Sequence, residues 1–138
     1  QSEDAPQPEV LWIEANREND LQALRAMLTD IPGRTEYWAA EGPDVQFDVT
    51  LVRPIRLKGI GIQWHLGDTR EAKFTLETST DGVTWRNVFE GASTGTSEGV
   101  ETYSFEPHEV EYVRFHGYGN TANAWNSIVH FRVIPADA

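Results

Sequence analysis

From residue 45 onwards the chain consists of short segments in which apolar and polar side chains alternate, and this pattern most constrains the fold. Successive side chains of a β-strand point to opposite faces of a sheet, so a period of two predicts strands buried on one face. The clearest segment has Val45, Phe47, Val49 and Leu51 as its apolar positions. Further strands are predicted around 60–64, 74–78, 85–89, 103–105, 113–115 and 129–133. Many short strands of this kind indicate an all-β antiparallel sandwich or jelly roll.

One short helix is predicted ahead of the strands. Leu21, Leu24 and Leu28 have helical spacing, the polar segment 18–20 suits a helix start, and Pro32-Gly33 would end the helix. Later in the chain the apolar positions on the two sides of Lys58-Gly59 are out of phase with each other. This phase change predicts a β-bulge there.

Length and composition favour a single folded domain. The chain has 138 residues, of which 39% are hydrophobic, and this is enough for one core. We expect residues 9–138 to form that domain, and the polar, proline-containing segment 1–8 to be a linker or a processed stub. The chain has no cysteine, which excludes disulfides, thiolate metal sites and a cysteine nucleophile.

The charge of the chain restricts its partners. Twenty-two acidic residues against 11 basic ones give a net charge of -11. Such a charge repels phosphate backbones and anionic membranes, and no apolar run is long enough to span a bilayer. We therefore expect no nucleic-acid partner and no membrane partner.

The strand order predicts which loops lie together. If each strand reverses direction, the loops around 35–44, 65–72, 90–100 and 117–126 share one end of the sandwich. Arg53-Pro54, the Asp81-Gly82 turn and the segment 106–109 then lie at the other end. A pyranose packs its apolar face on an aromatic ring and bonds its hydroxyls to planar polar groups, so the first end suits a sugar. Its candidate residues are Trp38, His65, Asp68, Arg70, Tyr118, Asn120, Asn123 and Trp125.

Several of these residues also have structural interpretations. Trp64 shares a face with apolar neighbours and is predicted to lie in the core, as are Trp12, Trp38 and Trp85. Trp125 is left open between core and ligand, whereas Tyr118, between two glycines, is expected to contact a ligand. Two polar residues have alternatives: His116 is either solvated or a sugar donor, and Arg70 either binds ligand or pairs with Asp68 or Glu71. His108 and His130 are expected to be structural.

No motif of a known catalytic class is present. A nucleophile elbow, a phosphate-binding glycine loop and a zinc-protease motif are all missing, and the pair of His65 and Asp68 is of a kind that any acidic chain offers by chance. We therefore expect a chain that is not an enzyme.

Three stretches of the chain carry recognisable motifs: Trp38-Ala39-Ala40-Glu41-Gly42 with 45–49, the region from Gly61 through 65–70 to Trp85, and the region from Tyr112 through Gly117-Tyr118-Gly119-Asn120 to Ile128. In their order and spacing these stretches resemble the discoidin-like domain, also called the coagulation-factor C-type domain, and especially bacterial carbohydrate-binding modules of family 32. The Gly-Tyr-Gly-Asn and Trp-Asn-Ser motifs are most similar to modules attached to polysaccharide lyases, including alginate lyases.

The resemblance implies a secreted, monomeric jelly-roll module that directs an attached polysaccharide-degrading enzyme to its substrate. It implies ligand contacts from His65, Asp68, Arg70, His116, Tyr118 and Asn120, to which the loop position adds Trp125. The favoured ligand is a uronic-acid polysaccharide such as alginate. A neutral galactan-like glycan, which the net charge favours, and a discoidin-type adhesion domain for protein or lipid surfaces are the alternatives.

The sequence departs from this family at its usual calcium site. The acidic segment expected before Trp38 reads Thr29-Asp30-Ile31-Pro32-Gly33-Arg34-Thr35-Glu36, and His130 stands where a glutamate is usual. Calcium prefers several oxygen ligands, so we expect no cofactor and no bound metal.

An acidic ligand requires a local basic patch on this acidic chain. His65, Arg70, Lys73 and His116 would supply it, because screening at about 8 Å in physiological salt favours nearby cations over distant carboxylates. Binding should then weaken with added salt, and should weaken between about pH 6 and 8 if the histidines act as cations near their usual pKa.

Overall fold

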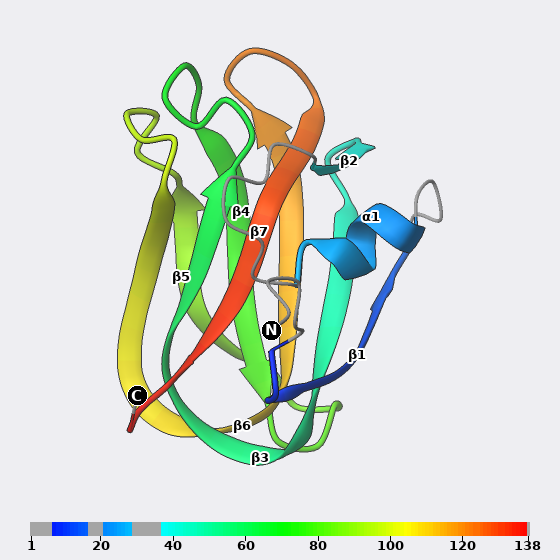
Figure 1. Ribbon diagram of the computed structural model, residues 1–138, viewed down its shortest axis with the longest axis vertical. Helices are drawn as coiled ribbons and strands as arrows, with labels where there is room; N and C mark the ends of the chain where they lie inside the picture. Colours follow the sequence, from blue (N-terminus) through cyan, green and yellow to red (C-terminus); the bar gives the residue numbers. More distant parts are fainter. Residues whose placement is uncertain (1–6, 17–20, 29–36, 138) are drawn as a thin grey trace, which may run out of the picture.

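The computed structural model describes residues 7–16, 21–28 and 37–137 (Figure 1). It confirms an all-β fold with one short helix, α1, which begins at Leu21 as predicted. The segments 18–20 and 32–33, predicted to start and end this helix, lie outside the described residues. The elements are β1 (Val10–Ala15), α1 (Leu21–Ala26), β2 (Trp38–Glu41), β3 (Val45–Trp64), β4 (Ala72–Ser79), β5 (Arg86–Ala92), β6 (Val100–Asn120) and β7 (Trp125–Pro135).

The long strands β3 and β6 bend and so belong to both layers of the sandwich. The first half of β3 pairs with residues 112–117 of β6, and the second half pairs with residues 100–104. One layer contains β1, β4, β5 and the paired halves that begin β3 and end β6. The other contains β2, β7 and the remaining halves, and every pairing is antiparallel.

Two segments predicted as loops are bends within these strands. The register shifts between Thr50 and Ile55, so Arg53-Pro54 lies inside β3, and the segment 106–109 lies inside β6. Both bends lie at the lower end of the molecule (Figure 1). Pro54 is exposed at the register shift, where its missing N–H costs no ladder bond. The predicted bulge is confirmed by a second register shift between Leu57 and Gly59.

Aromatic rings from both layers form the centre of the core. Phe47 stacks on Phe115 within one layer, with centroids 4.8 Å apart, and meets Phe131 of the other layer edge-on at 5.1 Å. Trp64 and Phe74 make a second contact between the layers at 4.9 Å. Each buried ring contributes about 1.5–3 kcal/mol, so this cluster fixes how the layers pack.

The free edge of β7 is covered by the side chain of Gln7. Its amide donates to the carbonyl oxygens of Phe131 (2.6 Å) and Leu28 (3.1 Å) and accepts from the Val133 N–H (3.0 Å), while the Phe131 N–H donates to Met27 O. These bonds satisfy strand groups that an uncovered edge would leave open. Gln7 is buried, although it belongs to the segment 1–8 that was expected to be a linker or a processed stub.

The tryptophans predicted to be buried divide into two groups. Trp38 and Trp64 lie in the core as predicted. The prediction is wrong for Trp12, which is 47% exposed on β1 and has the Arg25 guanidinium 4.8 Å above its ring. The prediction is also wrong for Trp85, which lies half-buried beside the turn after β4 and has the Arg114 guanidinium 3.9 Å above its ring.

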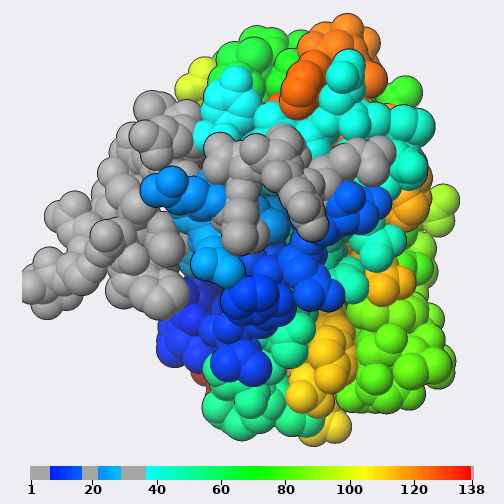
Figure 2. Space-filling model, turned by 90° about the vertical axis from the view of Figure 1, so that its right-hand side faces the viewer, coloured from blue at the N-terminus to red at the C-terminus, as the bar shows by residue number. Residues whose placement is uncertain are grey.

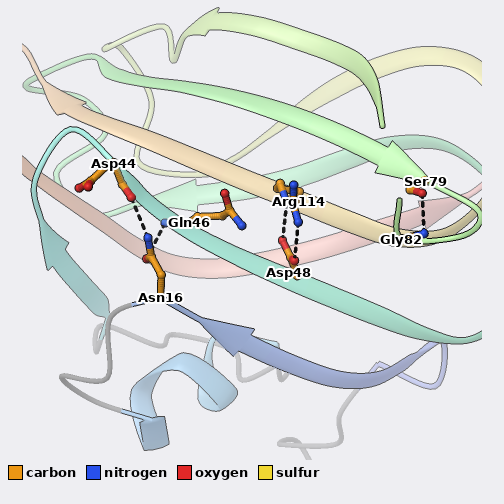
Figure 3. Close-up of polar contacts among 7 residues, drawn as sticks. All are labelled: Asn16, Asp44, Gln46, Asp48, Ser79, Gly82 and Arg114. Atoms are coloured by element: carbon orange, nitrogen blue, oxygen red, sulfur yellow. Dashed lines mark hydrogen bonds and ion pairs between the residues drawn. The ribbon is translucent and has the colours of Figure 1, made fainter. Parts of the chain in front are cut away.

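Polar contacts also fasten the outer face of the first layer (Figure 3). Arg114 donates two hydrogen bonds to the Asp48 carboxylate, at 2.9 and 3.0 Å. Asn16 donates to the Asp44 carbonyl and accepts from the Gln46 N–H, so the end of β1 is held against the start of β3.

The loop arrangement predicted from strand order is confirmed. The loops 65–71, 93–99 and 121–124 lie at the upper end of the molecule with β2, and the Asp81-Gly82 turn lies at the lower end (Figure 1). The pairing agrees, because Ala72 lies opposite Asn120 and Gln63 opposite Val100. Among the described residues, the single helix α1 is far too short to span a membrane.

Candidate binding site

A cavity of 370 Å³ opens at the loop end of the sandwich. Its lining comes from the residues before and within β2, from the loop 65–71, and from the loop and strand around β7. In Figure 2 the orange segment near residue 125 lies beside the cyan β2 segment at the top of the molecule. The lining residues are Tyr37, Ala39, His65, Arg70, Asn123, Trp125 and Ser127.

Strand alternation builds the floor and walls of this cavity. Ala39 of β2 lies directly opposite Ser127 of β7, and these small side chains form the floor. The next residues along the two strands, Trp38 of β2 and Ile128 of β7, point inward and are fully buried. Tyr37 and Trp125, each 40% exposed, stand along the same outward rows and supply two aromatic walls. Exposed aromatic rings in a cavity lining suit the apolar face of a sugar ring.

His65 is fixed between the strands and the cavity. Its backbone N–H donates to Ser127 O (3.1 Å), and its imidazole stacks on Tyr37 with centroids 3.7 Å apart and planes at 12°. Partial burial, and then the charge of Arg70, lower the pKa of His65 below its usual 6.5. A lowered pKa means that His65 carries a positive charge only at a lower pH than an unperturbed histidine does.

Arg70 is a charged side chain in the part of the cavity lining that the structure describes. Within the described part of the chain, no carboxylate forms an ion pair with its guanidinium, so neither of the alternatives with Asp68 and Glu71 is formed. A guanidinium that makes no internal ion pair keeps its donors for an external acceptor. Arginine presents these donors as a planar fork that matches a carboxylate.

The loop 121–124 is held in shape by Asn120. Asn120 Nδ2 donates to Asn123 Oδ1 (2.9 Å) and to Trp125 O (2.7 Å), and Asn120 Oδ1 accepts from the N–H groups of Ala122 (2.7 Å) and Asn123 (2.9 Å). The Trp125 N–H donates to Asn123 Oδ1 (3.0 Å). These bonds set the positions of two lining residues, Asn123 and Trp125.

The base of this loop is buried and equally well satisfied. Asn126 donates to the carbonyls of Ala40 and Gly42, both at 3.0 Å, and accepts from the Gly119 N–H at 2.8 Å. Gly119 has φ of +96°, a conformation that favours glycine. One asparagine therefore joins β2, β7 and the end of β6 beneath the cavity.

The structure brings three of the seven predicted site residues to the cavity, namely His65, Arg70 and Trp125. Asp68 lies beside Glu98 instead, where a hydrogen bond and charge repulsion from Asp68 raise the pKa of Glu98. The Asn120 side chain, at the end of β6, bonds the loop 121–124 and does not line the cavity.

His116 and Tyr118 also lie away from the cavity, on the outer face of the first layer. Their rings stack with centroids 4.7 Å apart, and the Tyr118 hydroxyl is hydrogen-bonded to Thr75 (3.0 Å). Sequence reasoning missed Tyr37, Ala39 and Ser127 as lining residues. Their positions out of phase with the buried Trp38 and Ile128 were a signal that could have identified them.

The metal expectation rests largely on residues that the structure does not describe. Within 7–16, 21–28 and 37–137, no group of three or more His, Asp or Glu side chains could hold a metal ion. The segment 29–36 falls outside these ranges, and His130 is buried within β7. His108, expected to be structural, bonds Thr78 Oγ1 at 2.8 Å.

A second, smaller cavity lies at the opposite end of the sandwich. It has a volume of 280 Å³, and its lining includes Arg53, Arg56 and Asp137. It lacks aromatic side chains, and its carboxylate offsets part of the arginine charge. Arg53 is therefore an arginine like Arg70 but lies at the opposite end of the sandwich from the loops.

Comparison with known proteins finds one family and many similar folds. The family model described as "F5/8 type C domain" matches residues 13–131. No protein with a curated description matches at a significant level. The family 32 carbohydrate-binding module of AlyQ, solved in complex with 4,5-unsaturated mannuronic acid, has a TM-score of 0.81 and 26% identity, covering 93% of this chain and 96% of that chain.

Two further solved structures show the same fold at lower identity. A pectin-binding module has a TM-score of 0.80 and 21% identity, over 96% of this chain and 94% of that one. The family 32 module of C. perfringens NanJ, in complex with galactose, has a TM-score of 0.72 and 18% identity, over 93% of this chain and 95% of that one.

Proposed function

We propose, because this chain belongs to the F5/8 type C domain family, that it binds a uronic-acid polysaccharide in the cavity at its loop end. The F5/8 type C domain is a binding module and not an enzyme. We further propose that the chain is a carbohydrate-binding module of family 32, because the similar solved structures include such modules.

The observation that carries this proposal is the charge of the cavity lining. The whole chain has a net charge of -11, yet the described residues that line the cavity include Arg70 and no aspartate or glutamate. At a screening length of about 8 Å, a guanidinium in direct contact with a ligand outweighs carboxylates elsewhere on the surface. The cavity therefore offers a local site for an anion on an acidic protein.

The geometry suits a uronate in particular. A pyranose ring can pack its C–H face on an exposed aromatic ring of the lining, such as Trp125. Its carboxylate can then accept two parallel hydrogen bonds from Arg70, and Asn123 can donate to a ring hydroxyl or to the same carboxylate. Neutral sugars would use the aromatic walls but leave the guanidinium without an anionic partner.

The similar structures agree with this assignment but do not decide it. The AlyQ module, at 26% identity, was solved with a uronic acid derivative. The pectin-binding and galactose-bound modules have lower identity and share the fold alone. We infer the ligand from the lining residues for this reason, with the AlyQ complex as support.

This ligand gives the module a role in polysaccharide degradation. We propose that it is secreted and monomeric, and that it is attached to a polysaccharide-degrading enzyme which it holds at its substrate. In the structure of truncated AlyQ a module of this family stands beside an alginate lyase domain, and it has 25% identity to this chain.

Affinity electrophoresis tests the ligand. The protein should be retarded by alginate and pectate gels, less so at higher salt, and little by agarose or a galactan. Replacing Arg70 with alanine should weaken uronate binding by about 1–3 kcal/mol, roughly 5- to 150-fold, because it removes a charge-assisted bond.

The Arg53→Ala variant is the matched control, since it changes the net charge equally at the opposite end and should bind as the parent does. A preference for neutral gels that does not respond to salt would contradict the uronate ligand and favour the galactan alternative. Binding to lipid vesicles and to none of the gels would favour the adhesion alternative.

A further inference from the structure

The amide of Asn120 is fully occupied within its own loop. It accepts two backbone hydrogen bonds, from Ala122 and Asn123, which identifies its oxygen. Its nitrogen donates two bonds, to Asn123 Oδ1 and to Trp125 O. These four bonds use both N–H donors of the amide and both lone pairs of its oxygen. Asn120 therefore affects the cavity through its neighbours and not by contact with a ligand.

The same bonds determine which way the Asn123 amide faces. Two donors, Asn120 Nδ2 (2.9 Å) and the Trp125 N–H (3.0 Å), point at one atom of this amide, which must therefore be the oxygen. No described residue accepts a hydrogen bond from Asn123 Nδ2, and Asn123 lines the cavity. The oxygen of the Asn123 amide is thus bonded within the loop, and its N–H donors are left for a ligand in the cavity.

We propose that Asn120 is a positioning residue that sets the hydrogen-bonding polarity of the cavity, by turning the Asn123 amide so that N–H donors meet the ligand. This inference rests on the proposed function, because the ligand it selects is one rich in acceptors. Arg70 and the Asn123 amide nitrogen then both present N–H donors at the cavity. These donors favour the carboxylate and hydroxyl oxygens of a ligand over the ammonium group of an amino sugar.

Asn120 also orders the aromatic wall. Its bond to Trp125 O is 2.7 Å long, and the Asn123 oxygen that it orients accepts from the Trp125 N–H. Both backbone groups of Trp125 are therefore held by one pair of asparagines. The stacking ring and the donor amide are presented together, and changing Asn120 should disturb both at once.

Two variants separate positioning from simple loss of stability. Asn123→Asp keeps an oxygen for Asn120 Nδ2 and the Trp125 N–H but replaces the outward donor with a second oxygen. Asn120→Ala removes the four hydrogen bonds of the Asn120 side chain. Binding is measured by titration calorimetry with an alginate oligosaccharide, with its neutral methyl ester and with a neutral galactan oligosaccharide. The near-UV circular dichroism of Trp125 is read as the difference from Trp125→Phe.

Asn123→Asp should retain the Trp125 signal and the melting temperature, yet lose about tenfold or more in affinity for the acid and much less for the ester. Asn120→Ala should lose the Trp125 signal and weaken all three ligands. Asn123→Asp binding the acid as the parent does, or Asn120→Ala keeping both signal and affinity, would overturn the inference. If the parent binds only the galactan, the proposed ligand fails, while the effect of Asn120 is still read on that glycan.

Discussion

Replacing Gln7 with alanine should cost far more stability than its place in a polar, proline-containing segment suggests. The change removes two bonds donated to the carbonyls of Phe131 and Leu28 and one accepted from the Val133 N–H. A net contribution of about 1 kcal/mol for each bond gives a loss of about 3 kcal/mol. Water entering the vacated space would lower this value, and poorly solvated strand groups would raise it, so we expect about 2–4 kcal/mol.

Urea unfolding followed by tryptophan fluorescence measures this loss. Gln63→Ala is the matched control, because Gln63 donates one bond to the Glu98 carbonyl (3.0 Å) at an exposed position and should cost less than about 1 kcal/mol. The slope of the transition should stay unchanged if the folded state is intact. A Gln7→Ala variant as stable as the Gln63→Ala control would refute the view that this side chain covers the edge of β7.

The remaining predictions concern pH, packing and metal. Because burial and Arg70 lower the folded-state pKa of His65, its contribution to stability is full above pH 6.5 and is lost as the pH falls through that lowered value; His65→Gln should reduce this acid loss in melting temperature. A bound uronate would raise the same pKa, so affinity for an alginate oligosaccharide should rise as the pH falls below 6.5 in the parent but not in His65→Gln. Gly117→Ala should cost about 1–3 kcal/mol in urea unfolding, since its Cβ would lie 2.4 Å from Asn126 Oδ1. Chelator should leave the melting temperature nearly unchanged, and a large loss restored by calcium would contradict the expectation of no metal.

The fold could be predicted because the period of two is a property of the strands themselves. Alternation at 45–51 and 60–64 indicated buried faces, and strand parity placed the loops at one end. The bends could not be found in this way, because Pro54 interrupts the pattern while β3 continues on both sides of it. Gln7 was missed since a single polar side chain gives no period, and its partners at 131 and 133 are distant in sequence.

The cavity lining was predicted only in part, and the predicted residues that lie elsewhere do so for a common reason. His116 and Tyr118 were grouped with the loop that follows them, although β6 continues to Asn120 and holds both on its outer face. Asn120 was expected to touch the ligand because amides suit sugars, but its four bonds stay within the loop. The residue type was therefore informative, whereas the direction of each side chain needed the strand boundaries.

The most direct measurement of the central claim is a nuclear magnetic resonance titration of the labelled protein with an alginate oligosaccharide. The account predicts that the largest shifts occur at the Trp125 indole N–H and the Arg70 side-chain N–H, together with the backbone of the loop 121–124. Arg53, at the opposite end, should not move. Shifts confined to His116 and Tyr118 on the outer sheet face, or to the cavity around Arg53, would contradict the proposed site.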